Sequence, residues 1–272
     1  MVTLYVIAAL AVLLPLAIGA LPATGPGRRL ARRLSDSAAV RRIGEALTGL
    51  VDTLGRPGAA LVVLFAWISA VVAVFWPIGE LMHSLENAVD RPVLTWIATR
   101  RNASFEEFNW FYTALGDRYP LKWVTVVGAV VFAVLWRRRF WIPLVAILGQ
   151  FAVEQYVQAV IAGMVDRGHP PTGLGTYPSG GIARICMVFG TLALFAVLTW
   201  RIGRRGQVAL GTLVLLLATY EGYSRLYTQK HWLTDVISGL AFGPVLFLGF
   251  AVAVGVLAGR VGAPHRAMEL VA

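Results

Sequence analysis

Residues 233–258, "LTDVISGLAFGPVLFLGFAVAVGVLA", form an almost uninterrupted apolar run near the end of the chain. A helix needs about 20 mainly apolar residues to cross the ~30 Å hydrocarbon core of a bilayer, so this run predicts a membrane-spanning helix. The rest of the chain has the same character. Of its 272 residues, 58% are hydrophobic and only 14% are charged, far from the usual balance of a soluble domain.

Six similar apolar runs precede this one, separated by charged or Gly- and Pro-rich segments. They lie at residues 2–21, 58–78, 120–136, 140–164, 182–200 and 207–224. The sequence therefore predicts an all-α protein, a polytopic membrane helix bundle with seven spans. Apolar residues at every third or fourth position also predict amphipathic helices in two connecting segments, 37–54 and 79–119. For the first of these segments, the pattern favours a solvated linker helix that only fixes the topology.

The positions of the basic residues predict how the bundle is oriented. Fifteen of the 24 Lys and Arg fall in four segments that a seven-span arrangement places on one side of the membrane, namely 28–56, 137–139, 201–205 and 260–266. Because Lys and Arg are enriched in cytoplasmic loops, we predict an outer N-terminus, a cytoplasmic C-terminus and outer loops at 79–119, 165–181 and 225–232. The basic residues that give the net charge of +10 follow this membrane pattern and form no patch interleaved with aromatic residues. Nucleic acid is therefore not a predicted partner.

The stretch "SRLYTQKHWLTD", residues 224–235, joins the last two predicted spans. His231 and Asp235 are four residues apart at a helix start and so share one face. A carboxylate that accepts a hydrogen bond from one imidazole nitrogen leaves the other nitrogen free to attack an electrophile. The alternative is a His–Asp pair that only fixes the helix start. Arg225 is suited to binding phosphate oxygens through its planar guanidinium, or to reaching lipid headgroups.

The stretch "VDRGHPPTGLGTYPSGGIAR", residues 165–184, joins two other spans on the same predicted side. Ser179, Gly180 and Gly181 precede the helix that begins near Ile182. Small residues allow a ligand to approach the backbone, and the free N–H groups of a helix start favour an anion. The alternative is that Ser179 serves only as the N-cap.

Other polar residues fall within or near predicted spans. Glu154, Gln158 and Glu221 either face the site or pair with cations elsewhere in the bundle. Cys186 is the only cysteine, so neither a disulfide framework nor a cysteine-based metal site is expected.

Taken together, the two stretches resemble the phosphatidic acid phosphatase type 2 (PAP2) superfamily of membrane lipid phosphatases. Its third motif is matched in full, from Ser224-Arg225 through His231 to Asp235, and its second in part, by Pro178-Ser179-Gly180. The likeness covers roughly residues 58–258. It implies a six-helix phosphatase core with one extra N-terminal transmembrane helix. The expected divisions are an N-terminal transmembrane helix with a basic cytoplasmic linker, the lipid phosphatase-like core, and a cytoplasmic tail, at residues 1–57, 58–260 and 261–272.

The resemblance also implies a chemistry. His231 would attack the phosphorus of a membrane lipid phosphate at the outer membrane face and form a phosphohistidine, which water then hydrolyses. Asp235 would orient His231, while Arg225, the Ser179 hydroxyl and the Gly180 backbone bind the phosphate oxygens. The family's reaction requires neither a metal nor another cofactor.

Three family positions differ in this chain. The histidine that ends the second motif, which protonates the leaving group, is Gly181; the lysine and arginine of the first motif are Ala162 and His169. General acid catalysis typically contributes ~10²–10⁴-fold, and it matters most for a basic leaving group such as an alkoxide. Phosphate leaving a diphosphate is much less basic. We therefore hypothesise a preference for a lipid diphosphate, such as a polyprenyl diphosphate, over a phosphomonoester.

Compensation for these losses is a second hypothesis. In it, His169 is the displaced acid, Arg167 and Arg184 are displaced phosphate ligands, and Gly181 remains part of the phosphate-binding helix start. Arg184 falls in a first helical turn, where the helix dipole disfavours a cation unless an anion binds; its alternative is contact with lipid headgroups. Two other functions stay open. One is a catalytically impaired relative that binds lipid phosphate for transport or complex assembly, and the other is a phosphotransferase that passes phosphate from His231 to another acceptor.

Overall fold

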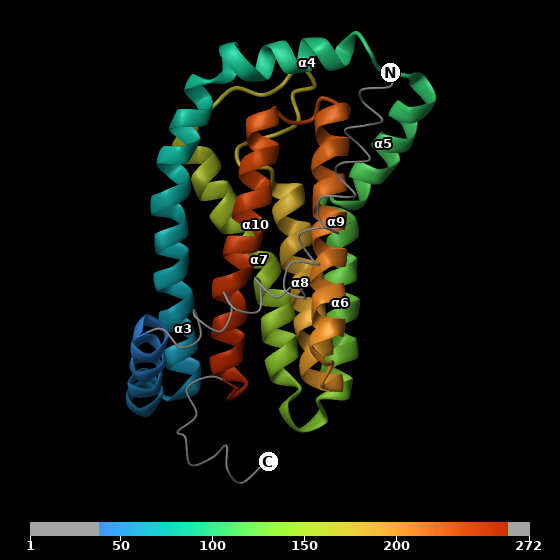
Figure 1. The fold of residues 1–272 in the computed structure, drawn as a ribbon. Helices are drawn as coiled ribbons and strands as arrows, with labels where there is room; N and C mark the ends of the chain where they lie inside the picture. The colour runs from blue at the N-terminus through green and yellow to red at the C-terminus, as the bar shows by residue number, and fades with distance from the viewer. Residues whose placement is uncertain (1–37, 261–272) are drawn as a thin grey trace.

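In the computed structural model, residues 38–260 are described, and they form helices and loops without a strand. Six long helices run alongside one another as a bundle (Figure 1). They are α3 (Ala38–Ser84), α6 (Arg118–Leu135), α7 (Trp141–Val165), α8 (Gly180–Trp200), α9 (Arg204–Tyr227) and α10 (Leu233–Leu257). The shorter elements are η2 (Glu86–Asp90), α4 (Arg91–Ala98), α5 (Ala103–Leu115) and η3 (Arg137–Arg139). The predicted all-α polytopic bundle is confirmed.

Five of these helices, α3, α6, α7, α8 and α10, are long and apolar enough to cross a membrane, so the chain is a multi-pass membrane protein. The helix α9 corresponds to the predicted span 207–224 and packs beside α8, but it is not among the five. Its last turns carry polar groups, including Glu221 and Arg225, which lower its apolar character. The first predicted span, at residues 2–21, lies outside the described residues.

The long helix α3 contains a break at Gly55, where φ is 68° and ψ is 170°. This left-handed conformation is one that glycine adopts with little strain, and Pro57 follows two residues later. Helix is therefore present on both sides of the break, as the pattern at 37–54 and the apolar run at 58–78 predicted. The domain division at residue 57 stays a prediction.

Close packing of α8 against α10 brings the two motif-bearing segments together. A Cβ atom on Gly243 of α10 would lie 2.9 Å from the Ala183 Cα atom of α8, so only glycine permits this approach. At the same end of these helices, the Ser179 amide donates a hydrogen bond to the Asp235 carbonyl at 3.1 Å.

The three predicted outer loops lie at one end of the bundle. Figure 1 shows α4 and α5 at the upper end, beside the loops that precede α8 and α10, with η3 at the lower end. The helices predicted between residues 79 and 119 are thus present as α4 and α5. Which side of the membrane this end faces stays a prediction.

Candidate active site

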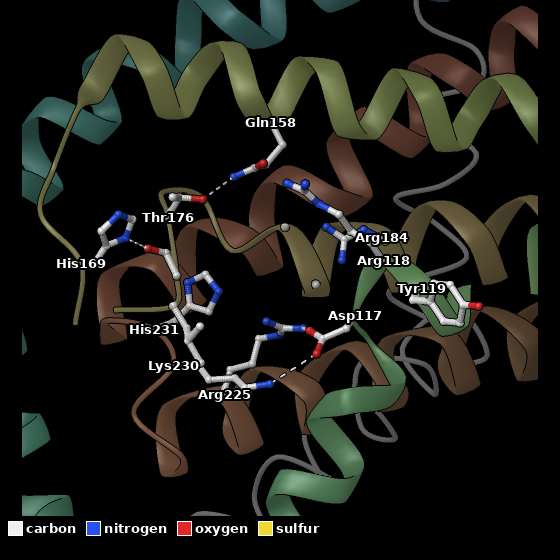
Figure 2. A pocket seen from close by; sticks show the side chains of 14 residues that line it. Asp117, Arg118, Tyr119, Gln158, His169, Thr176, Arg184, Arg225, Lys230 and His231 are labelled. Carbon is white, nitrogen blue, oxygen red and sulfur yellow. Dashed lines mark hydrogen bonds and ion pairs between the residues drawn. The ribbon is translucent and has the colours of Figure 1, made fainter. Parts of the chain in front are cut away.

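A cavity of about 550 Å³ opens between these loops, and Figure 2 shows its polar side chains. Its lining comes from the start of α6, from α7, from the loop before α8, from the start of α8, from the end of α9, and from the segment that joins α9 to α10. The lining residues are Asp117, Arg118, Tyr119, Gln158, His169, Leu174, Gly175, Thr176, Gly180, Gly181, Arg184, Arg225, Lys230 and His231. Six of the predicted site residues are among them, namely His169, Gly180, Gly181, Arg184, Arg225 and His231.

His231 and Asp235 form the pair that their spacing predicted. The His231 Nδ1 atom lies 3.3 Å from Asp235 Oδ2, and both side chains are buried. Asp235 Oδ2 also accepts a hydrogen bond from the Trp232 amide at 3.2 Å. A proton on Nδ1 satisfies the carboxylate and leaves Nε2 unprotonated. Burial lowers the pKa of His231, and this effect outweighs that of Asp235, which raises the pKa. The imidazole therefore stays neutral at pH values below its usual pKa.

Arg167 lies behind this pair and does not line the cavity. Its Nη1 atom donates to Asp235 Oδ1 at 3.1 Å and to the Thr234 hydroxyl at 2.8 Å, and its Nη2 atom donates to Asp90 Oδ2 at 2.8 Å. Asp90 in turn accepts hydrogen bonds from the amide and the hydroxyl of Thr234. Arg167 therefore holds the Asp235 carboxylate, which orients His231, from the side away from the cavity. Its role as a phosphate ligand stays a prediction that these contacts do not favour.

Arg225 reaches the cavity from α9. Its Nε atom donates to Glu221 Oε1 at 2.6 Å, and its Nη2 atom donates to Asp117 Oδ1 at 2.8 Å. A Cβ atom on Gly181 would lie 2.2 Å from Arg225 Nη2 and 2.3 Å from its Cζ and Nε atoms. The Arg225 guanidinium thus occupies the space of any side chain at position 181. A histidine at position 181, which the resemblance described above would lead one to expect, is incompatible with this position of the arginine.

Arg184 projects into the same cavity from the second turn of α8, because the helix begins at Gly180, two residues before the predicted start. Its Nε atom donates to Glu154 Oε2 at 3.1 Å and its Nη1 atom donates to the Gly116 carbonyl at 2.9 Å. Glu154 and Glu221 therefore each pair with an arginine that lines the cavity. These pairs orient the guanidinium groups of Arg184 and Arg225 from within the bundle.

Three charged residues of the lining were not identified from the sequence: Lys230, Asp117 and Arg118. Lys230 Nζ lies 3.4 Å from Asp117 Oδ2 and 4.8 Å from the centre of the Trp110 ring. Burial lowers the pKa of Lys230, and Arg225 lowers it further, against the opposite effect of Asp117. Burial alone would raise the pKa of Asp117, but Arg225 and Lys230 together hold it below its usual value. The only sequence signal for Lys230 was its position directly before His231.

The loop before α8 lies over the nucleophile candidate. The Nδ1–H group of His169 donates a hydrogen bond to the Gly175 carbonyl, and a Cβ atom on Gly175 would lie 2.9 Å from His231 Nδ1. Gln158 supports this loop by donating to the Thr176 hydroxyl at 2.9 Å. Ser179, in contrast, is buried and does not line the cavity, and its hydroxyl has no hydrogen-bond partner within residues 38–260.

Comparisons with known proteins bear on the fold. No family model matches the sequence, and no curated protein matches it. The structure is similar to the crystal structure of a PAP2-type phosphatidylglycerolphosphate phosphatase from Bacillus subtilis, with a TM-score of 0.57. The two sequences are 21% identical, and the match covers 66% of this chain and 92% of that chain. At this identity the likeness shows a shared fold.

Proposed function

We propose that this chain, which has the fold of the PAP2-type membrane phosphatases, is a lipid phosphatase that uses His231 as its nucleophile. The observation that carries the proposal is the convergence of His231, Arg225 and the glycines that open α8 on one cavity, with Asp235 behind the imidazole. A protein that only binds phosphate has no evident need for an oriented, neutral imidazole at such a position.

The proposed reaction proceeds in two displacements. His231 Nε2 attacks phosphorus, the bond from phosphorus to the leaving oxygen breaks, and the Nδ1 proton stays hydrogen-bonded to Asp235. Water then attacks the phosphohistidine, which releases phosphate and restores the imidazole. Arg225 and the backbone N–H groups at the start of α8 stabilise charge on the phosphoryl oxygens in both steps. No step in this scheme calls for a metal or another cofactor.

The charge of the cavity supports a lipid diphosphate, such as a polyprenyl diphosphate, as the preferred substrate. Four cationic side chains line the cavity against a single carboxylate, Asp117. The cations are Arg118, Arg184, Arg225 and Lys230. A diphosphate carries more negative charge than a monoester, and its leaving group needs a proton less. The lining offers His169 as an acid, and we propose that it assists a monoester more than a diphosphate.

The charge pattern supports an orientation for the site. Arg137, Arg138 and Arg139 form η3, at the end of the bundle opposite α4 and α5 (Figure 1). Since arginine-rich turns of membrane proteins are usually cytoplasmic, we propose that the cavity opens at the extracytoplasmic side. A membrane-impermeant thiol reagent checks this on intact cells. It should label a cysteine placed at exposed Tyr119 and not one placed at exposed Arg138, and the reverse pattern would overturn the orientation.

Phosphate release from a panel of lipids tests the activity. The full-length protein in detergent is given a polyprenyl diphosphate, the matching monophosphate and phosphatidic acid, alongside His231→Ala and the control His83→Ala. His83 is an exposed histidine of α3 that does not line the cavity. We expect fastest release from the diphosphate, loss of release in His231→Ala, and no change in His83→Ala.

Different results separate the parts of the proposal. Wild-type rates in His231→Ala would exclude His231 as the nucleophile. Faster release from the monophosphate would exclude the diphosphate preference. Binding of lipid phosphate without release would favour the impaired relative, and transfer of the phosphate to a second lipid would favour the phosphotransferase.

A further inference from the structure

Arg225 and Lys230 share one carboxylate inside the cavity. Asp117 Oδ1 accepts from Arg225 Nη2 at 2.8 Å, and Asp117 Oδ2 lies 3.4 Å from Lys230 Nζ. The two cations come from the end of α9 and the segment before α10, whereas Asp117 is the residue that precedes α6. Figure 2 shows the three side chains together on the wall below His231. The two oxygens of this carboxylate accept from two cations, as two oxygens of a phosphate group would.

Arg225 is oriented without Asp117. Its Nε atom is already bound to Glu221 at 2.6 Å, and its Nη2 atom lies 3.5 Å from the Thr113 carbonyl. The Arg225 side chain is 7% exposed, whereas the Asp117 side chain is 45% exposed. Asp117 therefore contacts the arginine from the open, cavity side. It covers donors that would otherwise face the cavity, instead of supporting the arginine from behind.

The Asp117 carboxylate also has a second hydrogen-bond donor within its reach, at the start of α6. It is the N-cap of α6, with the extended backbone of such a residue (φ −73°, ψ 162°), yet its side chain makes no capping hydrogen bond. An N-cap carboxylate usually accepts from the second or third helical amide. The third residue of α6 is Pro120, which has no N–H, so the Tyr119 amide is the available donor. Rotation of the Asp117 side chain alone suffices to exchange one partner for the other.

From these contacts we infer that Arg225 and Lys230 form a subsite for one phosphate group, which the Asp117 carboxylate occupies in the substrate-free protein. The substrate's phosphate displaces Asp117, and the carboxylate then caps α6. The inference deepens the proposed function, on which it rests for the identity of the lipid. It adds Lys230 to the phosphate-binding groups, although the family pattern expects a lysine only at the position of Ala162, which does not line the cavity.

Displacement makes Asp117 a determinant of specificity. An incoming anion competes with a carboxylate that is already bound, so a more highly charged headgroup gains access more easily. Removing the charge of Asp117 while keeping its shape should therefore tighten anion binding. If Asp117 instead positioned the cations for the substrate, the same change would weaken binding. The sign of the effect thus separates the two roles.

The experiment compares full-length wild-type protein with Asp117→Asn, Lys230→Met and the control Asp166→Asn. Asp166 is an exposed residue at the end of α7, with a left-handed backbone that asparagine tolerates, and it does not line the cavity. The dissociation constant of inorganic phosphate is measured by the shift in melting temperature, and KM is measured for a lipid diphosphate. Melting temperatures without phosphate verify folding.

Phosphate should bind Asp117→Asn about tenfold more tightly, as expected when one charged competitor at a partly exposed site is removed, and KM should fall by a similar factor. Lys230→Met should bind phosphate more weakly, and Asp166→Asn should match wild type. Unchanged or weaker phosphate binding in Asp117→Asn, or no phosphate binding at all, overturns the inference. Tighter phosphate binding with an unchanged KM contradicts displacement by the lipid. If no lipid is hydrolysed but Asp117→Asn still binds phosphate more tightly, the proposed function fails and the subsite stands.

Discussion

The close contact between Gly181 and Arg225 makes Gly181→Ala a sharp test of the site. The added Cβ atom would lie 2.2–2.3 Å from three atoms of the guanidinium group. Because carbon contacts are favourable only near 3.5–4.0 Å, the guanidinium must move by more than about 1 Å. It is bound at 2.6 Å to Glu221 and at 2.8 Å to Asp117, so such a shift breaks at least one of these hydrogen bonds.

The magnitude follows from the bond that is lost. A hydrogen bond to a charged group contributes about 1.5–3 kcal/mol, so a displaced Arg225 that no longer donates to the reacting phosphoryl group should lower kcat/KM roughly 10–150-fold. Gly181→His, which restores the family residue, should lose at least as much. The matched control is Gly163→Ala on α7, where an added Cβ atom meets nothing within 4 Å.

The assay measures kcat/KM for the best lipid substrate together with the dissociation constant of inorganic phosphate and the melting temperature. We expect Gly163→Ala to stay close to wild type and Gly181→Ala to lose both turnover and phosphate affinity. Wild-type values for both quantities in Gly181→Ala would refute the claim that Arg225 occupies this space and binds the phosphate.

Three further predictions concern the groups around the nucleophile. Arg167→Met leaves two buried carboxylates without their cation and should destabilise the protein by about 3–5 kcal/mol. Arg91→Met, at an ion pair whose arginine side chain is 61% exposed, should change the melting temperature little. Because burial lowers the pKa of His231, the rate should fall on the acid side only below about pH 6.5. Asp235→Asn removes a group that raises this pKa, so the acid limb of the pH–rate profile should move to lower pH in this variant. An acid-side inflection above pH 6.5 in the wild type would contradict the prediction. His169→Ala should slow release from a monophosphate more than release from a diphosphate, and equal effects on the two substrates would remove it as the acid.

The fold was largely predictable because apolar length alone specifies membrane helices. The run at 58–78 lies within α3, and the run at 233–258 corresponds to the whole of α10. The helix α9 shows the limit of this signal, since residues such as Glu221 reduce its apolar character even though it packs within the bundle. Its polar end serves the site, where Glu221 binds Arg225.

The candidate site was predictable where its residues follow a local spacing, as with His231 and Asp235. It was not predictable where contacts join distant segments. Asp117 meets Arg225 across 108 positions of sequence, and no spacing rule indicates such a pair. Arg167 was interpreted as a phosphate ligand because its partner Asp90, 77 positions away, could not be identified. In the same way, the sequence indicates Gly181 as a small residue of a phosphate-binding helix start and as a lost acid, but not that the Arg225 guanidinium lies against it.

The covalent state of His231 during turnover tests the central claim most directly. Full-length protein is mixed with a lipid diphosphate that carries a radiolabelled terminal phosphate, quenched within the first turnover, and digested for peptide mapping. We predict an acid-labile, base-stable label on the peptide that contains His231, and none in His231→Ala. Turnover by the wild type without such a label, or a label on any other residue, would contradict the account.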